Sequence, residues 1–216
     1  MVETRSHSAG SVLRRVGGAG WLVLGGSVPR MTGGSTWMDE LLSRIDLGRP
    51  AAWLATAPNA EAPVQFLEDL QGLIGAPVDR LPAAGIGWET CSVVILTTPA
   101  SLSALRSIEA RLRACLEAEG VVVALGAPAA AFGEAHLGET GPPVDGLGWL
   151  QGAIVLLDPQ PASEDERLRD WLVSTEKRYA LRLPEASILG LGPEGEVEVW
   201  GMARPGVTLG SAWRHA

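Results

Sequence analysis

The residues Gly126-Ala127-Pro128-Ala129-Ala130 follow an apolar run, at a place where a buried strand is expected to turn into a helix. In α/β hydrolytic enzymes this junction often carries the nucleophile, in the pattern G-x-S-x-G on a sharp and strained turn. Pro128 stands at the serine's place, and Ala130 stands at the place of the last glycine. Acyl transfer needs a nucleophile, a base and donors for the oxyanion, and proline supplies no nucleophile.

Pro128 also changes the backbone expected at this turn. A nucleophile elbow holds its central residue in a strained conformation, generally at positive φ, whereas proline is held near a φ of about −65°. We therefore expect the elbow to have relaxed, with Pro128 as the first residue of a helix, where its missing N–H costs nothing. The N–H groups of Ala129 and Ala130 at that helix start are candidates for a weak anion or carbonyl site.

A nucleophile at another position would need its own base. Ser101 and Ser103 lie at the expected start of a helix, where a serine is typically the N-cap. His136 is the one histidine in the body of the chain, because His7 and His215 lie near the termini. It falls in the glycine-bounded segment FGEAHLG, which favours a surface histidine over a catalytic base.

A second candidate site is the glycine-rich loop GGSVPRMTGGST at residues 25–36, which joins an expected strand to an expected helix. Phosphate groups often bind at such a junction, so Gly26 and Ser27 are candidate ligand-binding residues, with Arg30 close by. The loop lacks the lysine of G-x-x-x-x-G-K-[ST] and the spacing of G-x-G-x-x-G. A turn followed by a helix cap is the favoured interpretation, and an anion or nucleotide site is the alternative.

The elements that position these residues alternate between strand and helix along most of the chain. Strands are expected at 21–24, 51–55, 78–81, 91–97 and 121–125, and helices are expected after Thr36, over 64–75 and over 102–120. Runs such as CSVVILT are apolar throughout, which is typical of parallel strands covered on both faces. The order predicts an α/β fold, a three-layer α/β/α sandwich with a mainly parallel sheet and right-handed crossovers.

The last third of the chain has a different pattern. We expect a strand within 146–158, a helix over 163–178 with a Ser163–Glu166 capping box, and strands at 180–191 and 196–201. The last two form a C-terminal β-hairpin, and the tail adds an edge strand. Residues 1–18 are expected to be a flexible N-terminal arm, and residues 19–216 a single α/β domain.

Composition restricts the partners and cofactors. The net charge of −8 argues against nucleic acid and anionic membranes. No apolar run reaches the roughly 18–20 residues of a membrane span, and no signal peptide is evident, so a cytoplasmic protein is expected. The cysteines Cys91 and Cys115 are interpreted as buried thiols, and we predict neither a metal site nor a cofactor. Trp37, Trp88 and Trp213 lie near expected loops or ends and are candidates for an apolar partner patch.

The layout resembles the cyanophycinase and aspartyl dipeptidase group of serine peptidases, which have the class I glutamine amidotransferase-like fold. The segments WLVLGGS, WLATAPNAEAPVQFLEDLQGLIGAPVDRLP, SVVILTTPASLSALRSIEARLRACLEAEGVVVALGAPAAAFG, GLGWLQGAIVLLD and PEASILGLGPEGEVEVWG follow that family's order, over roughly residues 20–202. The resemblance implies a substrate-binding turn after the fourth strand, a serine at the elbow, a histidine after a later strand and an acidic residue in the terminal hairpin.

The chain departs from each family signature except the last. The substrate turn reads Thr97-Thr98-Pro99-Ala100-Ser101, the elbow serine is Pro128, and Leu157-Asp158-Pro159-Gln160 holds no histidine. Glu185 matches the acidic position, and Thr98 keeps a place in the candidate ligand site. The joint losses predict a catalytically silent, peptidase-like protein that acts as a binding or interaction module, as a homodimer or with a protein partner. The rival hypothesis is an active hydrolase with a relocated nucleophile, drawing on Ser101 or Ser103, His136 and Glu185.

Overall fold

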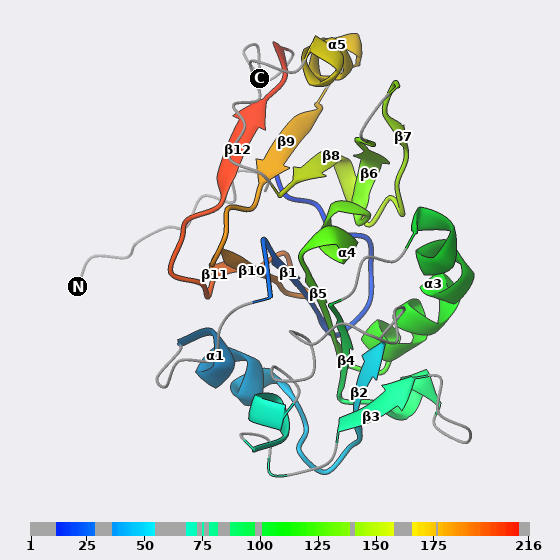
Figure 1. The fold of residues 1–216 in the computed structure, drawn as a ribbon, viewed down its shortest axis with the longest axis vertical. Helices are drawn as coiled ribbons and strands as arrows, with labels where there is room; N and C mark the ends of the chain where they lie inside the picture. Colours follow the sequence, from blue (N-terminus) through cyan, green and yellow to red (C-terminus); the bar gives the residue numbers. More distant parts are fainter. Residues whose placement is uncertain are drawn as a thin grey trace, which may run out of the picture.

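The protein was analysed as a computed structural model. It describes residues 12–28, 36–54, 68–72, 75, 78–81, 87–97, 101–138, 141–157, 166–175 and 177–211. Within these ranges the chain has a mixed α/β fold built on two sheets (Figure 1).

The first sheet contains the parallel strands that the apolar runs predicted. Over the described residues it has seven strands, in the order β11-β10-β1-β5-β4-β2-β3. The parallel members are β1 (Trp21–Gly25), β2 (Ala51–Leu54), β3 (Val78–Leu81), β4 (Val93–Leu96) and β5 (Val121–Leu125). The antiparallel members are β10 (Ile188–Leu191) and β11 (Val197–Val199), which form the expected hairpin.

Helices cover the two faces of this sheet because its strands are apolar on both. Helix α1 (Thr36–Arg44) packs with Val23, Ile95 and Val123 in one cluster. Helix α3 (Leu102–Glu117) packs with Leu24, Leu96 and Val122 in another. Successive strand residues point to opposite faces, so α1 and α3 lie on opposite sides of the sheet. A short helix, η1 (Trp88–Thr90), precedes β4, and residues 68–72 are helical.

The second sheet lies above the first in Figure 1. Within the described ranges it has five strands in the order β12-β9-β8-β6-β7: β12 (Gly206–Leu209), β9 (Tyr179–Arg182), β8 (Leu150–Leu156), β6 (Gly133–His136) and β7 (Val144–Asp145). Helix α4 (Ala127–Ala130) leads into it, and α5 (Glu166–Ser174) packs on it. Side chains of both sheets, among them Phe132, Tyr179 and Leu22, belong to one buried cluster.

The structure differs from the sequence-based expectations for one strand, one loop and two tryptophans. Residues 180–191 are not one strand but two, β9 and β10, in different sheets, because a turn at Pro184–Ser187 separates them and Ala186 has a φ of 60°. The FGEAHLG segment contains strand β6, which was not predicted from the sequence because the strand is only four residues long. Trp37 and Trp88 are buried core residues, not a surface patch, and Trp213 lies outside the described residues.

The expected N-terminal arm is docked in its described part. Val16 donates a backbone hydrogen bond to Trp149 at 2.8 Å, and the Gln151 N–H donates to Arg14 at 3.1 Å. Val12 and Leu13 pack against the main core. Backbone hydrogen bonds to residues 149 and 151 therefore hold residues 14 and 16 against the second sheet, within the segment expected to be an arm.

Candidate functional site

The candidate site lies at the carboxyl ends of β1, β4 and β5. These three strands are neighbours, with Gly25 paired to Leu125 and Leu96 paired to Ala124. The residues that follow them therefore meet at one edge of the sheet, where ligands of open α/β sheets commonly bind.

Gly126 forms the corner between β5 and α4. Its φ of 69° and ψ of −139° lie in a region that only glycine adopts readily. The Gly126 N–H donates to the Gly25 carbonyl at 2.9 Å, which ties the corner to β1. Among the described residues, a Cβ built on Gly126 meets no atom within 4 Å. The sharp strand-to-helix turn is thus retained, with its strained residue two positions before Pro128, and the corner carries no side chain.

The backbone at Pro128 is helical and unstrained, as expected, although Pro128 is the second residue of α4 and not the first; the strain lies at Gly126 instead. Pro128 is buried inside α4, where a proline in the first turn is compatible with the helix. The N–H of the buried Ala129 donates to the Gly126 carbonyl at 2.8 Å. That N–H already has a partner within the turn, so Ala129 is not the open anion donor that the sequence suggested.

The candidate residues after β1 are closely packed. The Gly26 N–H donates to the Ser187 carbonyl at 3.1 Å. A Cβ on Gly26 would lie 2.1 Å from the Pro184 carbonyl oxygen, so Gly26 is required for the close approach of two backbones. Ser27 is half-buried. The glycine pair after β1 therefore serves packing against the turn before β10.

The turn after β4 is described only at its start. Thr97 is buried and accepts a hydrogen bond from Trp53 Nε1 at 2.8 Å. Thr98 lies outside the described residues, as do Arg30 and most of the loop that follows Val28.

Among the described residues, neither Ser101 nor Ser103 is hydrogen-bonded to His136 or Glu185, so the residues proposed for a relocated triad are not linked as a triad. Ser101 Oγ accepts from the Ala104 N–H at 3.2 Å, so Ser101 is the N-cap of α3, and it lies 2.9 Å from Ser103 Oγ. His136 ends β6, and its buried Nδ1 has no hydrogen-bond partner. Glu185 is exposed in the turn before β10.

Other reactive groups lie in the core. Cys91 and Cys115 are buried free thiols, as expected. Burial, followed by the neighbouring Cys91, raises the pKa of the Cys115 thiol to about 12, which leaves it protonated and a poor nucleophile at neutral pH. Among the described residues, no three His, Cys, Asp or Glu side chains come together as ligands for a metal ion. None of the described helices is long and apolar enough to cross a membrane.

The prediction from the sequence placed the elbow two residues too late along the chain. It centred the turn on Pro128, whereas the strained corner is Gly126, the first residue after the strand. The signal that could have found it is the glycine that directly follows a fully apolar strand. No protein-family model and no curated protein matches this sequence.

Proposed function

We propose that this chain is a diverged relative of the cyanophycinase and aspartyl dipeptidase group, with a three-layer class I glutamine amidotransferase-like domain that is catalytically silent. In this proposal it acts as a binding or interaction module. Parallel strands in the first sheet, helices α1 and α3 on its opposite faces and the β10–β11 hairpin support the assignment.

The observation that carries the proposal is the empty corner at Gly126. The backbone there has the strained strand-to-helix turn that a nucleophile elbow needs, and a Cβ would meet no atom within 4 Å. Glycine supplies neither hydroxyl nor thiol, and the residues at the next two positions are Ala127 and Pro128. Acyl transfer at this corner therefore lacks a nucleophile, although the described residues leave room for a side chain at Gly126.

A fluorophosphonate probe tests catalytic silence on the full-length protein. We expect no covalent adduct on the folded wild-type chain. A specific adduct overturns the proposal, and its loss in Ser101→Ala or Ser103→Ala would identify the relocated nucleophile.

The Gly126→Cys variant tests the geometry of the corner separately. A thiol placed there is expected to react with iodoacetamide in the folded protein, while buried Cys91 and Cys115 serve as unreactive internal controls. A folded Gly126→Cys protein whose new thiol stays as unreactive as the native pair would show that the corner is closed.

A further inference from the structure

Strand β12 (Gly206–Leu209) forms an outer edge of the second sheet. Its only strand neighbour among the described residues is β9. All four residues are exposed, with Val207 at 45% and Leu209 at 47%. Exposed edges are usually protected by charged side chains, prolines or bulges, and the sequence GVTL contains none of these.

The direction of the backbone groups follows from the register. The Gly210 N–H donates to the Arg178 carbonyl at 2.8 Å, continuing the pairs Thr208–Ala180 and Gly206–Arg182. Hydrogen-bonded pairs alternate along an antiparallel ladder. The backbone N–H and C=O groups of Val207 and Leu209 therefore point away from β9, toward the open edge.

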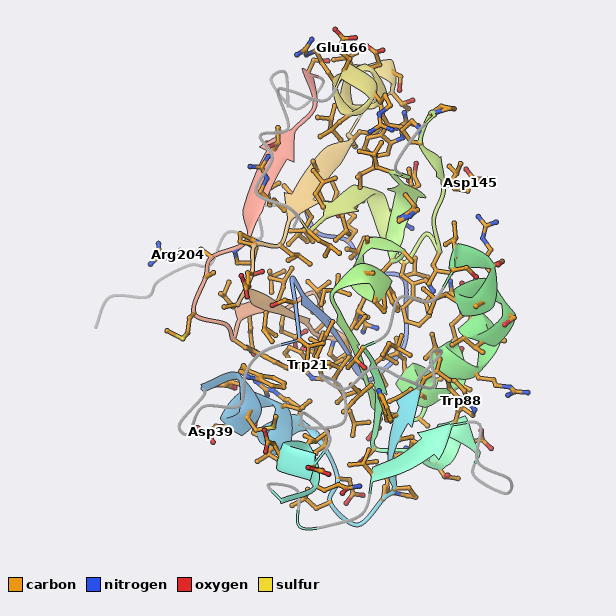
Figure 2. The ribbon with its side chains drawn as sticks, viewed as in Figure 1. Trp21, Asp39, Trp88, Asp145, Glu166 and Arg204 are labelled. Carbon is orange, nitrogen blue, oxygen red and sulfur yellow. The ribbon has the colours of Figure 1, made fainter. Side chains whose placement is uncertain are left out.

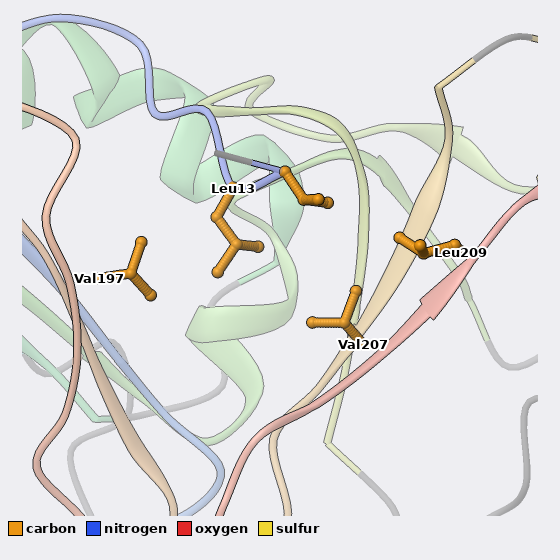
Figure 3. A pocket seen from close by; sticks show the side chains of 5 residues that line it. Leu13, Val197, Val207 and Leu209 are labelled. Atoms are coloured by element: carbon orange, nitrogen blue, oxygen red, sulfur yellow. The ribbon is translucent and has the colours of Figure 1, made fainter. Parts of the chain in front are cut away.

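Apolar side chains surround the same strand. Val207 and Leu209 line a groove of about 390 Å³ with Val12, Leu13 and Val197 (Figure 3). Met202, in the connection between β11 and β12, is 95% exposed. Exposed apolar residues that gather in this way typically mark an interaction surface.

We propose that a second copy of this chain pairs with β12 in the antiparallel direction, across a two-fold axis at Thr208. Val207 then lies opposite the partner's Leu209, and Leu209 lies opposite the partner's Val207. Each such pair exchanges two backbone hydrogen bonds, so the outward groups of both residues are satisfied. A register centred on Val207 would instead use Pro205, which has no N–H to donate.

The side chains suit the same register. Residues directly opposite each other share a face, so Val207, Leu209 and their partner equivalents form one continuous apolar stripe. On the other face, Thr208 meets the partner's Thr208, and threonine pairs across strands are favourable. An isologous interface requires such self-complementarity, and β12 provides it within one short strand.

The absence of charge on β12 permits pairing with a second copy. The chain carries a net charge of −8, which makes copies repel over most of their surfaces. Strand β12 is uncharged, and the charged residues nearest to it in the ladder and the chain are Arg178, Arg182 and Arg204. Figure 2 shows Arg204 pointing outward from the molecule. Two-fold pairing therefore brings together an uncharged strand from each copy, away from the acidic surfaces that repel each other.

Sedimentation velocity on the full-length protein over a range of concentrations tests this interface, with circular dichroism as the check of folding. We expect a reversible dimer, and Leu209→Lys is expected to raise its dissociation constant by roughly a hundredfold, since the change occurs twice in each dimer. The matched control is Val144→Lys, because Val144 is 50% exposed on β7, at the opposite edge of the same sheet. This variant is expected to dimerise like the wild type.

Thr208→Cys tests the register. A non-hydrogen-bonded pair places Cα atoms about 4.5 Å apart, within the range of a disulfide, so oxidation is expected to give a covalent dimer. Thr90→Cys, at an exposed position on η1, serves as the collision control. The inference is overturned if the wild-type chain stays monomeric at every concentration, or if Leu209→Lys still dimerises like the wild type. It is also overturned if β12 binds a different protein in preference to a second copy. The proposed function uses none of these residues. The result of the fluorophosphonate test is therefore independent of whether the chain dimerises through β12.

Discussion

Replacing Gly126 by alanine tests the interpretation of the empty corner. The residue has a φ of 69° and a ψ of −139°, and such a conformation costs a non-glycine residue about 1–3 kcal/mol. The added methyl group meets no atom within 4 Å, so steric overlap contributes nothing. We therefore expect Gly126→Ala to lower the free energy of unfolding by about 2 kcal/mol through backbone strain alone.

Two further glycines separate strain from steric overlap. Gly72, in the helical segment 68–72, also has no atom within 4 Å of an added Cβ, but its φ is not positive. Gly72→Ala is expected to raise the free energy of unfolding by roughly 0.5–1 kcal/mol, because glycine is unfavourable in a helix. At Gly26 the added atom would meet the Pro184 carbonyl oxygen at 2.1 Å, and the expected loss is about 3 kcal/mol.

Equilibrium unfolding in urea, followed by circular dichroism, measures all three changes on one scale. The reasoning predicts a gain for Gly72→Ala, an intermediate loss for Gly126→Ala and the largest loss for Gly26→Ala. If Gly126→Ala were as stable as the wild type, the corner would not be strained, and its likeness to a nucleophile elbow would be refuted.

Two other groups give independent predictions. Glu198 accepts hydrogen bonds from Arg44 at 3.1 and 3.2 Å. Glu198→Gln should therefore lower the free energy of unfolding, measured by urea titration, by about 1 kcal/mol. If this loss of stability were the same at high salt, an ionic origin would be contradicted. Tyr179, the single tyrosine, has a buried hydroxyl without a partner, so Tyr179→Phe should raise the free energy of unfolding by roughly 1 kcal/mol. Burial, followed by the Glu134 carboxylate, raises the pKa of Tyr179. Above the ordinary tyrosine value of about 10, the folded state therefore keeps a proton that the unfolded state releases, and stability should fall as pH rises. In Tyr179→Phe the free energy of unfolding should fall less steeply above about pH 10. Identical pH profiles for the two proteins would contradict a contribution from Tyr179.

Much of the first sheet follows from local sequence. Strand β5 was predicted with its exact bounds, because five consecutive apolar residues between Gly120 and Gly126 allow little else. Ser101 caps α3 as expected. At the expected helix end, the Gly75 N–H donates to the Gln71 carbonyl at 2.9 Å and the φ of Gly75 is 69°, as is typical of a glycine that ends a helix. Such signals involve residues within one turn of each other, so the sequence by itself contains them.

The second sheet and the site depended on distant segments. A local turn at Pro184–Ser187 separates β9 from β10, but which sheet each strand joins depends on its partner, β8 for β9 and β1 for β10. Gly26 is fixed by a carbonyl from residue 187, far along the chain. The exposed edge of β12 likewise depends on where β9 lies.

The sequence therefore determined the parallel strands of the first sheet and the helix α3 with its Ser101 cap, and it determined that no nucleophile directly follows β5. The tertiary structure decided that the sharp turn survives at Gly126 and that β12 remains an open edge. The physical reason is that periodicity and capping act between near neighbours, whereas strand pairing and backbone strain are set by hydrogen bonds between residues far apart in the chain.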